Sequence, residues 1–317
     1  MQPESKAPAV RIDDLSKRFG DFVAVDHVSI EVRQGEIFGF LGPNGAGKST
    51  TIRILCGLMA PTSGKATVAG FDVGRQSEDI KRNIGYMSQK FSLYDDLTVE
   101  ENIEFFGGVY GVTAEKLAER EEYVLKMAGL EDKRKMMTRV LAGGWKQRLA
   151  LGCAILHEPP ILFLDEPTSG VDPIARRSFW ELIYQLSEAG HTIFVTTHYM
   201  DEAEYCHRIA LMYGGRVIAL GSPAELKTSL GVGRLLHLET SDLLPSMTAL
   251  EGKPGVLDIA VFGGGLHLKV DDDAAAIPVI RGALAAAGIQ VLKLEAITPS
   301  MEDVFVSLIE AQEKAAA

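Results

Sequence analysis

The sequence has few cysteines, and none of the three, Cys56, Cys153 and Cys206, stands in a Cys-x-x-Cys pair. This spacing argues against a disulfide framework and a zinc site, and it favours reduced, cytosolic thiols. Basic residues are outnumbered, with 32 lysines and arginines against 43 aspartates and glutamates, and the formal net charge is -11. Because coating nucleic acid requires a basic face, we expect no nucleic acid partner.

Long apolar runs are also missing, since no window approaches the roughly 18 residues of a membrane span. The first residues, MQPESKAPAV, lack the basic segment and apolar run of a signal peptide. We therefore expect a protein that would act at a membrane only by docking there. The chain has 317 residues, 46 % of them hydrophobic and 24 % charged, enough for one large domain and one small domain.

Residues 1–230 alternate strand-like runs, such as ILFLDEP and TIFVTTH, with helical patterns. This alternation predicts an α/β domain with a mostly parallel sheet flanked by helices. Residues 231–317 have a different texture, with short strands in LLHLET, LDIAVF and LHLKV and then an alanine-rich helix over about residues 273–287. The pattern predicts a small α+β module, with Gly231 to Gly233 as the hinge before it.

A strand, IQVLKLEAI, and a final helix complete the predicted module. Two start signals for that helix are open: Pro299 at the first helical position after Thr298, or a capping box of Ser300 and Asp303.

The stretch GPNGAGKST, at Gly42 to Thr50, fits the phosphate-loop pattern G-x-x-x-x-G-K-[ST]. A chance match in a glycine-rich turn is the alternative, but the stretch follows a strand-like run and precedes a helix-like one, as the mechanism requires. Its backbone amides would surround phosphates, Lys48 would reach the β and γ phosphates, and the Ser49 hydroxyl could bind magnesium. The predicted ligand is a nucleoside triphosphate.

The run ILFLDEP predicts a buried strand that ends in two carboxylates. Asp165 is placed to hold magnesium, and Glu166, next to it, to act as the general base for an attacking water. Capping of a solvated strand end is the alternative, and it would be preferred for such a pair without the phosphate loop.

Three further side chains are weaker candidates. His198 follows a strand and could contact a γ phosphate or the attacking water, although a lone histidine there is more often structural. Gln89 could touch metal and water, but a glutamine in a polar loop is usually solvated. Phe19 is expected ahead of the first strand and could stack on a base or belong to the core.

Taken in order, GPNGAGKST, YMSQ, AGGWKQR, ILFLDEP, SGVD and TTH resemble the ATP-binding subunit of an ABC transporter, over about residues 10–227. Two segments, LYDDLTVEENIEFF and Pro299 to Phe305, resemble the corresponding segments in subunits of drug and polysaccharide exporters. The resemblance implies a P-loop NTPase cassette with a mostly parallel sheet, an antiparallel β part and a helical signature subdomain at about residues 90–160. It also implies ATP and Mg²⁺ as cofactors.

The resemblance also implies roles for single residues. Phe19 corresponds to the adenine-stacking aromatic, Gln89 to the magnesium-sensing glutamine, Asp165 to the metal ligand, Glu166 to the base and His198 to the switch histidine. The phosphate loop consists of Gly42, Pro43, Asn44, Gly45, Ala46, Gly47, Lys48, Ser49 and Thr50, and the loop that crosses the subunit boundary of Ser169, Gly170, Val171 and Asp172. The expected magnesium ligands are Ser49, Gln89 and Asp165, and the catalytic set is Glu166, His198, Gln89 and Lys48.

The family signature, LSGGQ, is altered in this sequence, because Ala142 stands where the family has serine. In the family this segment reaches the ATP of a second subunit, so the expected contacts in trans are Ala142, Gly143, Gly144 and Gln147. The missing hydroxyl removes a hydrogen bond to a charged group, worth about 1.5 to 3 kcal/mol. Since the catalytic groups remain, we expect a site that can hydrolyse ATP but in which the signature binds the γ phosphate less tightly. Trp145 is expected to be a packing anchor.

These features predict an ATP-hydrolysing motor subunit that forms a homodimer or heterodimer and drives a separate membrane permease for export. It would then lie in the cytoplasm, on the inner face of the cell membrane. An alternative is an ATP-dependent dimerising sensor with weak hydrolysis. Translation-linked and repair ABC proteins are disfavoured because the chain has one cassette and no long heptads. The cargo and the task of the C-terminal module do not follow from the sequence.

Overall fold

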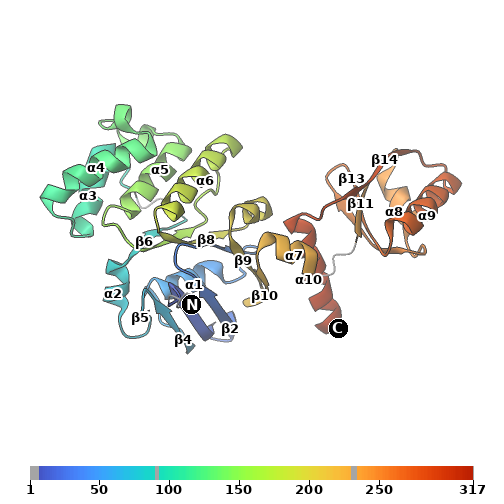
Figure 1. Ribbon diagram of the computed structural model, residues 1–317, viewed down its shortest axis with the longest axis horizontal. Helices are drawn as coiled ribbons and strands as arrows, with labels where there is room; N and C mark the ends of the chain where they lie inside the picture. The colour runs from blue at the N-terminus through green and yellow to red at the C-terminus, as the bar shows by residue number, and fades with distance from the viewer. Residues whose placement is uncertain (1–6, 90–92, 230–233, 317) are drawn as a thin grey trace, which may run out of the picture. The chain divides into compact units, whose positions relative to one another are not determined.

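The apolar runs that flank the phosphate loop and the Asp-Glu pair form one sheet. In the computed structural model, which describes residues 7–89, 93–229 and 234–316, this sheet has six strands. They are β3 (Ile37–Leu41), β6 (Ile84–Met87), β7 (Ile161–Asp165), β8 (Thr192–Thr197), β9 (Arg208–Tyr213) and β10 (Arg216–Gly221). Their order is β10-β9-β3-β8-β7-β6, and only the β9–β10 pair is antiparallel (Figure 1).

Strands β3, β7 and β8 consist entirely of buried residues. This pattern is typical of parallel strands that are covered on both faces, which explains their continuous apolar runs. The predicted mostly parallel sheet is confirmed.

A second, antiparallel sheet is formed by β1 (Val10–Phe19), β2 (Phe22–Val32), β4 (Ser63–Val68) and β5 (Phe71–Asp72), in the order β2-β1-β4-β5. Helix α1 (Lys48–Leu55) contacts β2, β4 and β7, so it packs against both sheets. Its residues Ile52 and Leu55 are fully buried in the core that the two sheets share. The helix that follows the phosphate loop is therefore fixed by apolar packing along its length.

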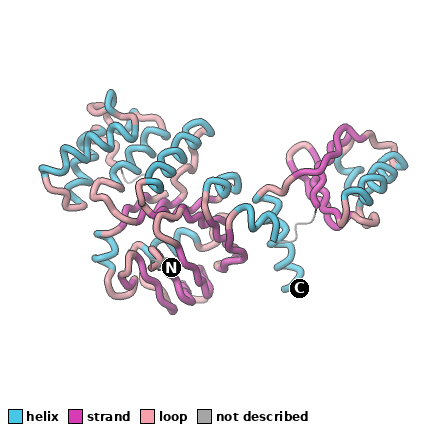
Figure 2. Tube along the Cα trace, viewed as in Figure 1, coloured by secondary structure: helices cyan, strands magenta, loops and turns pink. Residues whose placement is uncertain are grey.

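The remaining helices of this part are α2 (Ser77–Arg82), α3 (Val99–Val109), α4 (Ala114–Ala128), α5 (Gly143–Ala154) and α6 (Pro173–Glu188). Helix α5 contacts α3, α4 and α6, and Figure 2 shows these four helices gathered on one side of the strands. Thr98 and Glu101 form a reciprocal capping box at the start of α3. Gly129, with φ of +67°, ends α4 in the left-handed conformation that favours glycine.

The C-terminal module is a four-stranded antiparallel sheet with two helices packed on one side (Figure 2). Its elements are β11 (Arg234–Thr240), α8 (Leu243–Leu250), β12 (Val256–Phe262), β13 (Gly265–Val270), α9 (Asp273–Ala286), β14 (Val291–Ile297) and α10 (Met301–Ala316). The strand order is β12-β13-β11-β14. The predicted α+β character is confirmed, and so is the capping box, because Ser300 and Asp303 exchange hydrogen bonds before α10.

The chain divides into two compact units, residues 1–223 and 224–317, and α7 (Pro223–Ser229) begins at the division. The predicted hinge at Gly231 to Gly233, and the predicted boundary at residue 230, lie outside the described residues. Within the described ranges, every helix is too short or too polar to span a bilayer.

Candidate functional site

The phosphate loop runs from the end of β3 to the first turn of α1. Gly47 is the N-cap of α1 in the left-handed conformation, with φ of +104°. A Cβ atom at Gly47 would lie 2.2 Å from the carbonyl oxygen of Ala24, and one at Gly42 would lie 2.2 Å from that of Met212. Both approaches involve backbone atoms that cannot move aside, so these two positions require glycine.

Lys48 is the first residue of α1, and only 4 % of its surface is exposed. Its Nζ donates to the carbonyl oxygens of Gly42 at 2.7 Å and Pro43 at 3.1 Å, and lies 3.5 Å from Oε1 of Glu166. Burial lowers the pKa of Lys48, while the carboxylate of Glu166 acts in the opposite direction. The ammonium group is thus held between the loop and the end of β7.

Asp165, at the end of β7, is 2 % exposed, and its Oδ1 accepts two hydrogen bonds. Ser49 Oγ donates to it over 3.0 Å and Thr196 Oγ1 over 2.7 Å. Asp165 and Thr196 are neighbours in the β7–β8 pairing. The sequence analysis did not single out Thr196, although its place two residues before His198 on the adjacent strand was a usable signal. Hydroxyl and carboxylate oxygens are the donors that Mg²⁺ prefers, so this pair fits the expected metal.

Glu166 follows Asp165 and has a positive φ of 49°, which is uncommon for a residue with a side chain. Its backbone N–H donates to the carbonyl oxygen of Thr196 at 3.1 Å, which holds this conformation in place. Strained backbone of this kind is concentrated at functional sites.

Glu166 is 6 % exposed, and side chains from three other segments of the chain surround its carboxylate. Gln89 Nε2 donates to Oε2 over 2.9 Å, and Nδ1 of His198 lies 3.2 Å from the same oxygen. Lys48 faces Oε1. The structure therefore brings together Lys48, Ser49, Gln89, Asp165, Glu166 and His198, all of which were expected to act together.

A cleft of about 370 Å³ opens above these groups. Its lining comprises Phe22, Ala24, Asn44, Gly45, Ala46, Gly47, Lys48, Ser49, Thr50, Gln89 and Glu166. Phe22, rather than Phe19, is the aromatic in this lining, and it is exposed. Phe19 does not lie ahead of the first strand but is the last residue of β1, where it pairs with Phe22 across the β1–β2 hairpin. The ammonium of Lys17 lies 5.2 Å from the centre of the Phe19 ring. The sequence analysis missed Phe22.

The signature segment lies apart from this lining. Ala142 is the N-cap of α5 and provides no side-chain cap, and a Cβ atom at Gly144 would lie 2.9 Å from Cβ of Ala175 in α6. Helix α6 is in turn capped by Asp172, whose Oδ1 accepts from the amides of Ile174 and Ala175. The signature and the Ser169–Asp172 loop therefore converge where α5 and α6 begin.

Two other side chains of the signature segment, Trp145 and Gln147, differ in how their polar and aromatic groups are contacted. Trp145 has the Lys133 ammonium 4.3 Å and the Arg148 guanidinium 5.2 Å from its ring, which favours the anchor interpretation. Gln147 is 1 % exposed, and its Oε1 has no hydrogen-bond partner among the described residues.

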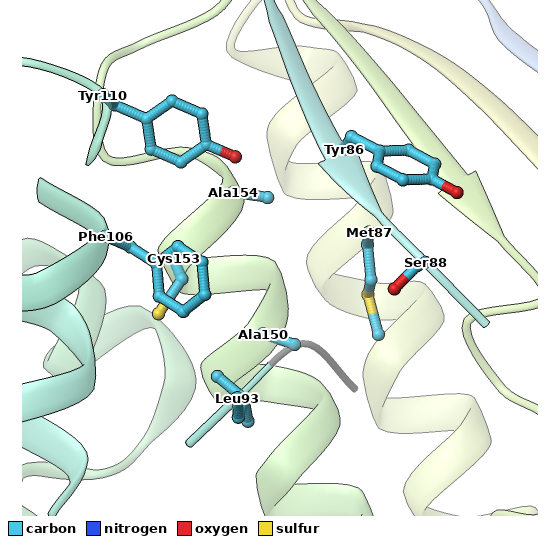
Figure 3. Close-up of a pocket in the computed structure, with 9 residues that line it drawn as sticks. All are labelled: Tyr86, Met87, Ser88, Leu93, Phe106, Tyr110, Ala150, Cys153 and Ala154. Atoms are coloured by element: carbon cyan, nitrogen blue, oxygen red, sulfur yellow. The ribbon is translucent and has the colours of Figure 1, made fainter. Parts of the chain in front are cut away.

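A second, smaller hollow of about 30 Å³ lies beside the strand that leads to Gln89. Figure 3 shows Tyr86, Met87 and Ser88 on one side of it and side chains from α3 and α5 on the other. These include Phe106, Ala150, Cys153 and Ala154, with Tyr110 and Leu93 completing the lining. Burial raises the pKa of Tyr86 and of Tyr110 to about 12.

Comparisons with known proteins agree with this geometry. Residues 25–169 match the ABC transporter family, and residues 221–309 match the C-terminal domain of DrrA1-3-like ATP-binding proteins. The linearmycin resistance ATP-binding protein LnrL of Bacillus subtilis is 35 % identical over 305 residues, which are 94 % of this chain and 97 % of that protein.

The probable multidrug ABC transporter ATP-binding protein YbhF of Escherichia coli is 54 % identical over 218 residues, or 69 % of this chain. The match spans only 38 % of the length of YbhF. Among solved structures, a dimeric ATP-binding cassette in a post-hydrolysis state with ADP and Pi aligns with a TM-score of 0.61 and 29 % identity, covering 67 % of this chain and 98 % of that one. The chain belongs to the ATP-binding subunits of the ABC transporter family.

Proposed function

We propose that the chain binds Mg²⁺-ATP in the cleft above the phosphate loop and hydrolyses it with Glu166 as the general base. The observation that carries this proposal is the Glu166 carboxylate, which is buried among Gln89, His198 and Lys48 and stands beside the Ser49–Asp165 pair. A carboxylate that is held by several side chains next to the phosphate site is well placed to orient water.

Each group of residues would have its own role in the reaction. The amides of the phosphate loop and the Lys48 ammonium bind the β and γ phosphates and stabilise the charge that develops on them. Glu166 takes a proton from water, whose oxygen bonds to the γ phosphorus while the bond to the β–γ bridging oxygen breaks, giving ADP and phosphate. His198 would donate to a γ oxygen from its position against Glu166. Ser49, Asp165 and Gln89 would hold Mg²⁺, which supplies charge neutralisation on the phosphates.

The second part of the proposal is a head-to-tail dimer, with a copy of the chain or a related one. The signature residues do not line the chain's own cleft, and they converge with the Ser169–Asp172 loop at the start of α5 and α6. The signature that contacts the ATP in this cleft would therefore come from a second subunit. The aligned cassette that is dimeric and holds ADP and Pi supports this arrangement.

The third part concerns transport. We infer that the dimer drives a membrane permease that exports a drug-like, lipid or polysaccharide cargo, because relatives are named for multidrug transport and for linearmycin resistance. The hollow between β6, α3 and α5 is the proposed contact for the permease (Figure 3). The subunit would then work on the inner face of the cell membrane. The C-terminal module is proposed to stabilise or regulate the dimer.

Mixing two inactive variants tests whether each ATP site is shared between two subunits. Lys48→Ala removes the phosphate contact, and Gly143→Asp places a negative charge in the signature at a position where an added Cβ atom meets nothing within 4 Å. Each variant alone should release no phosphate from Mg²⁺-ATP. The mixture should regain turnover, because one site of a mixed dimer combines an intact phosphate loop with an intact signature. A silent mixture, with an active native chain, would contradict the shared site.

A further inference from the structure

A polar cluster with a buried centre lies outside the cleft lining, on the segments that follow β7 and β8. Its centre is Glu202, on the short 3-10 helix Met200–Tyr205, and its side chain is 0 % exposed. Thr168, which is also fully buried, donates from Oγ1 to Oε1 of Glu202 over 2.6 Å. The second oxygen, Oε2, has no hydrogen-bond partner among the described residues. A buried carboxylate with one side-chain hydrogen bond carries a desolvation cost that apolar packing would avoid.

Arg176, in the first turns of α6, connects this carboxylate to an aromatic ring. Its Nε lies 3.7 Å from Oε1 of Glu202, and its Nη1 donates to Oδ2 of Asp201 over 3.4 Å. The carbon at the centre of its guanidinium group lies 4.0 Å from the ring centroid of Tyr199. This spacing is that of a cation–π contact, which is strongest where water is excluded.

Both ends of the cluster reach the site. The Tyr199 ring lies 4.2 Å from that of His198, whose Nδ1 is 3.2 Å from Glu166. At the other end, Thr168 is two residues beyond Glu166, in the turn that leads into the Ser169–Asp172 loop. The cluster therefore joins the segment after β7, which carries the base, to the segment after β8, which carries the histidine.

We propose that Arg176, Tyr199 and Glu202 are positioning residues, which hold His198 against Glu166 and fix the Ser169–Asp172 loop relative to both. The proposal rests on the proposed ATPase function and deepens it. The contacts of the three side chains carry this assignment: Tyr199 packs against the His198 ring and Glu202 accepts from Thr168, so they act through His198 and Thr168. Small displacements of catalytic groups are costly, since a shift of about 1 Å can reduce a rate roughly 100-fold.

The first experiment measures steady-state phosphate release by the full chain with Arg176→Met. The expected result is a fall in kcat of roughly 10- to 100-fold with little change in KM for ATP. Arg177→Met is the matched control, because the neighbouring Arg177 side chain is 80 % exposed and its recorded ion pair is a surface contact with Glu181. Tyr199→Phe should keep the ring contacts and most of the turnover, whereas Tyr199→Leu should lose both.

A double-mutant cycle with His198→Ala then distinguishes a positioning role of Arg176 from a general loss of stability. If Arg176 acts through His198, Arg176→Met should cause little further loss in the His198→Ala background. Equal losses in both backgrounds, or a change confined to KM, would overturn the proposal.

The second experiment does not depend on hydrolysis. The ring-proton resonance of His198 is assigned in the full chain by its absence from His198→Ala. It should move in Arg176→Met and stay in place in Arg177→Met, since only Arg176 touches the Tyr199 ring beside it. An unmoved resonance would overturn the inference even in an active protein. A moved resonance in a chain without turnover above Glu166→Gln would instead support the positioning contact and count against the proposed ATPase.

Discussion

The side-chain amide of Gln89 donates to Oε2 of Glu166 over 2.9 Å, across 77 positions of sequence. The contact exists because β6 and β7 are parallel neighbours whose carboxyl ends meet at one edge of the sheet. Strand β8, on the other side of β7, brings His198 to the same oxygen. The register of three adjacent strands therefore fixes the environment of the proposed base, and this edge is the usual ligand site of open α/β sheets.

The hydrogen bond between Ser49 and Asp165 predicts that a substitution at Asp165 weakens the response of turnover to magnesium. Asp165→Asn removes the negative charge that accepts from Ser49 and Thr196, so it should raise the Mg²⁺ concentration needed for half-maximal turnover by at least about tenfold, the effect of roughly 1.4 kcal/mol. Asp271→Asn, at an exposed position in the C-terminal module, is the control. A magnesium titration of phosphate release measures both, and coincident curves would remove Asp165 from the metal site.

The N-cap of α5 predicts two separable effects of restoring the family's serine. Ala142 has extended backbone angles but no side-chain acceptor, so Ala142→Ser should stabilise the chain by about 1 kcal/mol through a cap hydrogen bond. It should also raise turnover, because in the proposed dimer the hydroxyl would reach the γ phosphate bound by the second subunit.

Ala142→Gly distinguishes these two effects. Glycine is only a few tenths of a kcal/mol poorer than serine as an N-cap, but it has no hydroxyl. Both variants should therefore unfold at a higher temperature than the native chain when nucleotide is absent. Phosphate release, in contrast, should rise only in Ala142→Ser. Equal turnover in the two variants would assign the effect to helix stability alone.

Features whose signal is local in the chain could be predicted from the sequence, while their chemical roles stay predictions. The phosphate loop, the Asp-Glu pair and the capping box of Ser300 and Asp303 each depend on residues within a few positions of one another. Thr196, Phe22 and the Thr168–Glu202 hydrogen bond were not predicted, because strand register and helix packing decide which distant side chains meet. Phe19 and Phe22 illustrate the limit: both flank one turn, and only the folded hairpin shows which of them faces the phosphate loop.

Asp303 predicts an acid-sensitive C-terminal module. Burial would raise its pKa, but hydrogen bonds from the Ser300 hydroxyl, the His267 ring and the Ser300 amide outweigh burial, and the pKa lies below its ordinary value of 3.8. The stabilisation is therefore fully present above that value and is lost as pH falls through the lowered pKa. Asp303→Asn should cost about 1 to 3 kcal/mol at neutral pH.

Thermal unfolding of the full chain at several pH values measures this effect. The difference between the native chain and Asp303→Asn should be present at neutral pH and shrink below about pH 4. Asp271→Asn is again the control, because its side chain is exposed. A difference that persists unchanged at the lowest pH would show that the charge of Asp303 is not the cause.

The most direct test of the account is phosphate release from Mg²⁺-ATP by the purified chain, beside Glu166→Gln, over a range of protein concentrations. Glutamine keeps the size of the side chain but cannot accept the proton, so turnover should fall by at least about 100-fold while ATP still binds. Native turnover per chain should rise with concentration, because each site of the proposed dimer requires a second subunit. Turnover in Glu166→Gln that matches the native chain would contradict Glu166 as the base, and turnover independent of concentration in a monomer would contradict the shared site.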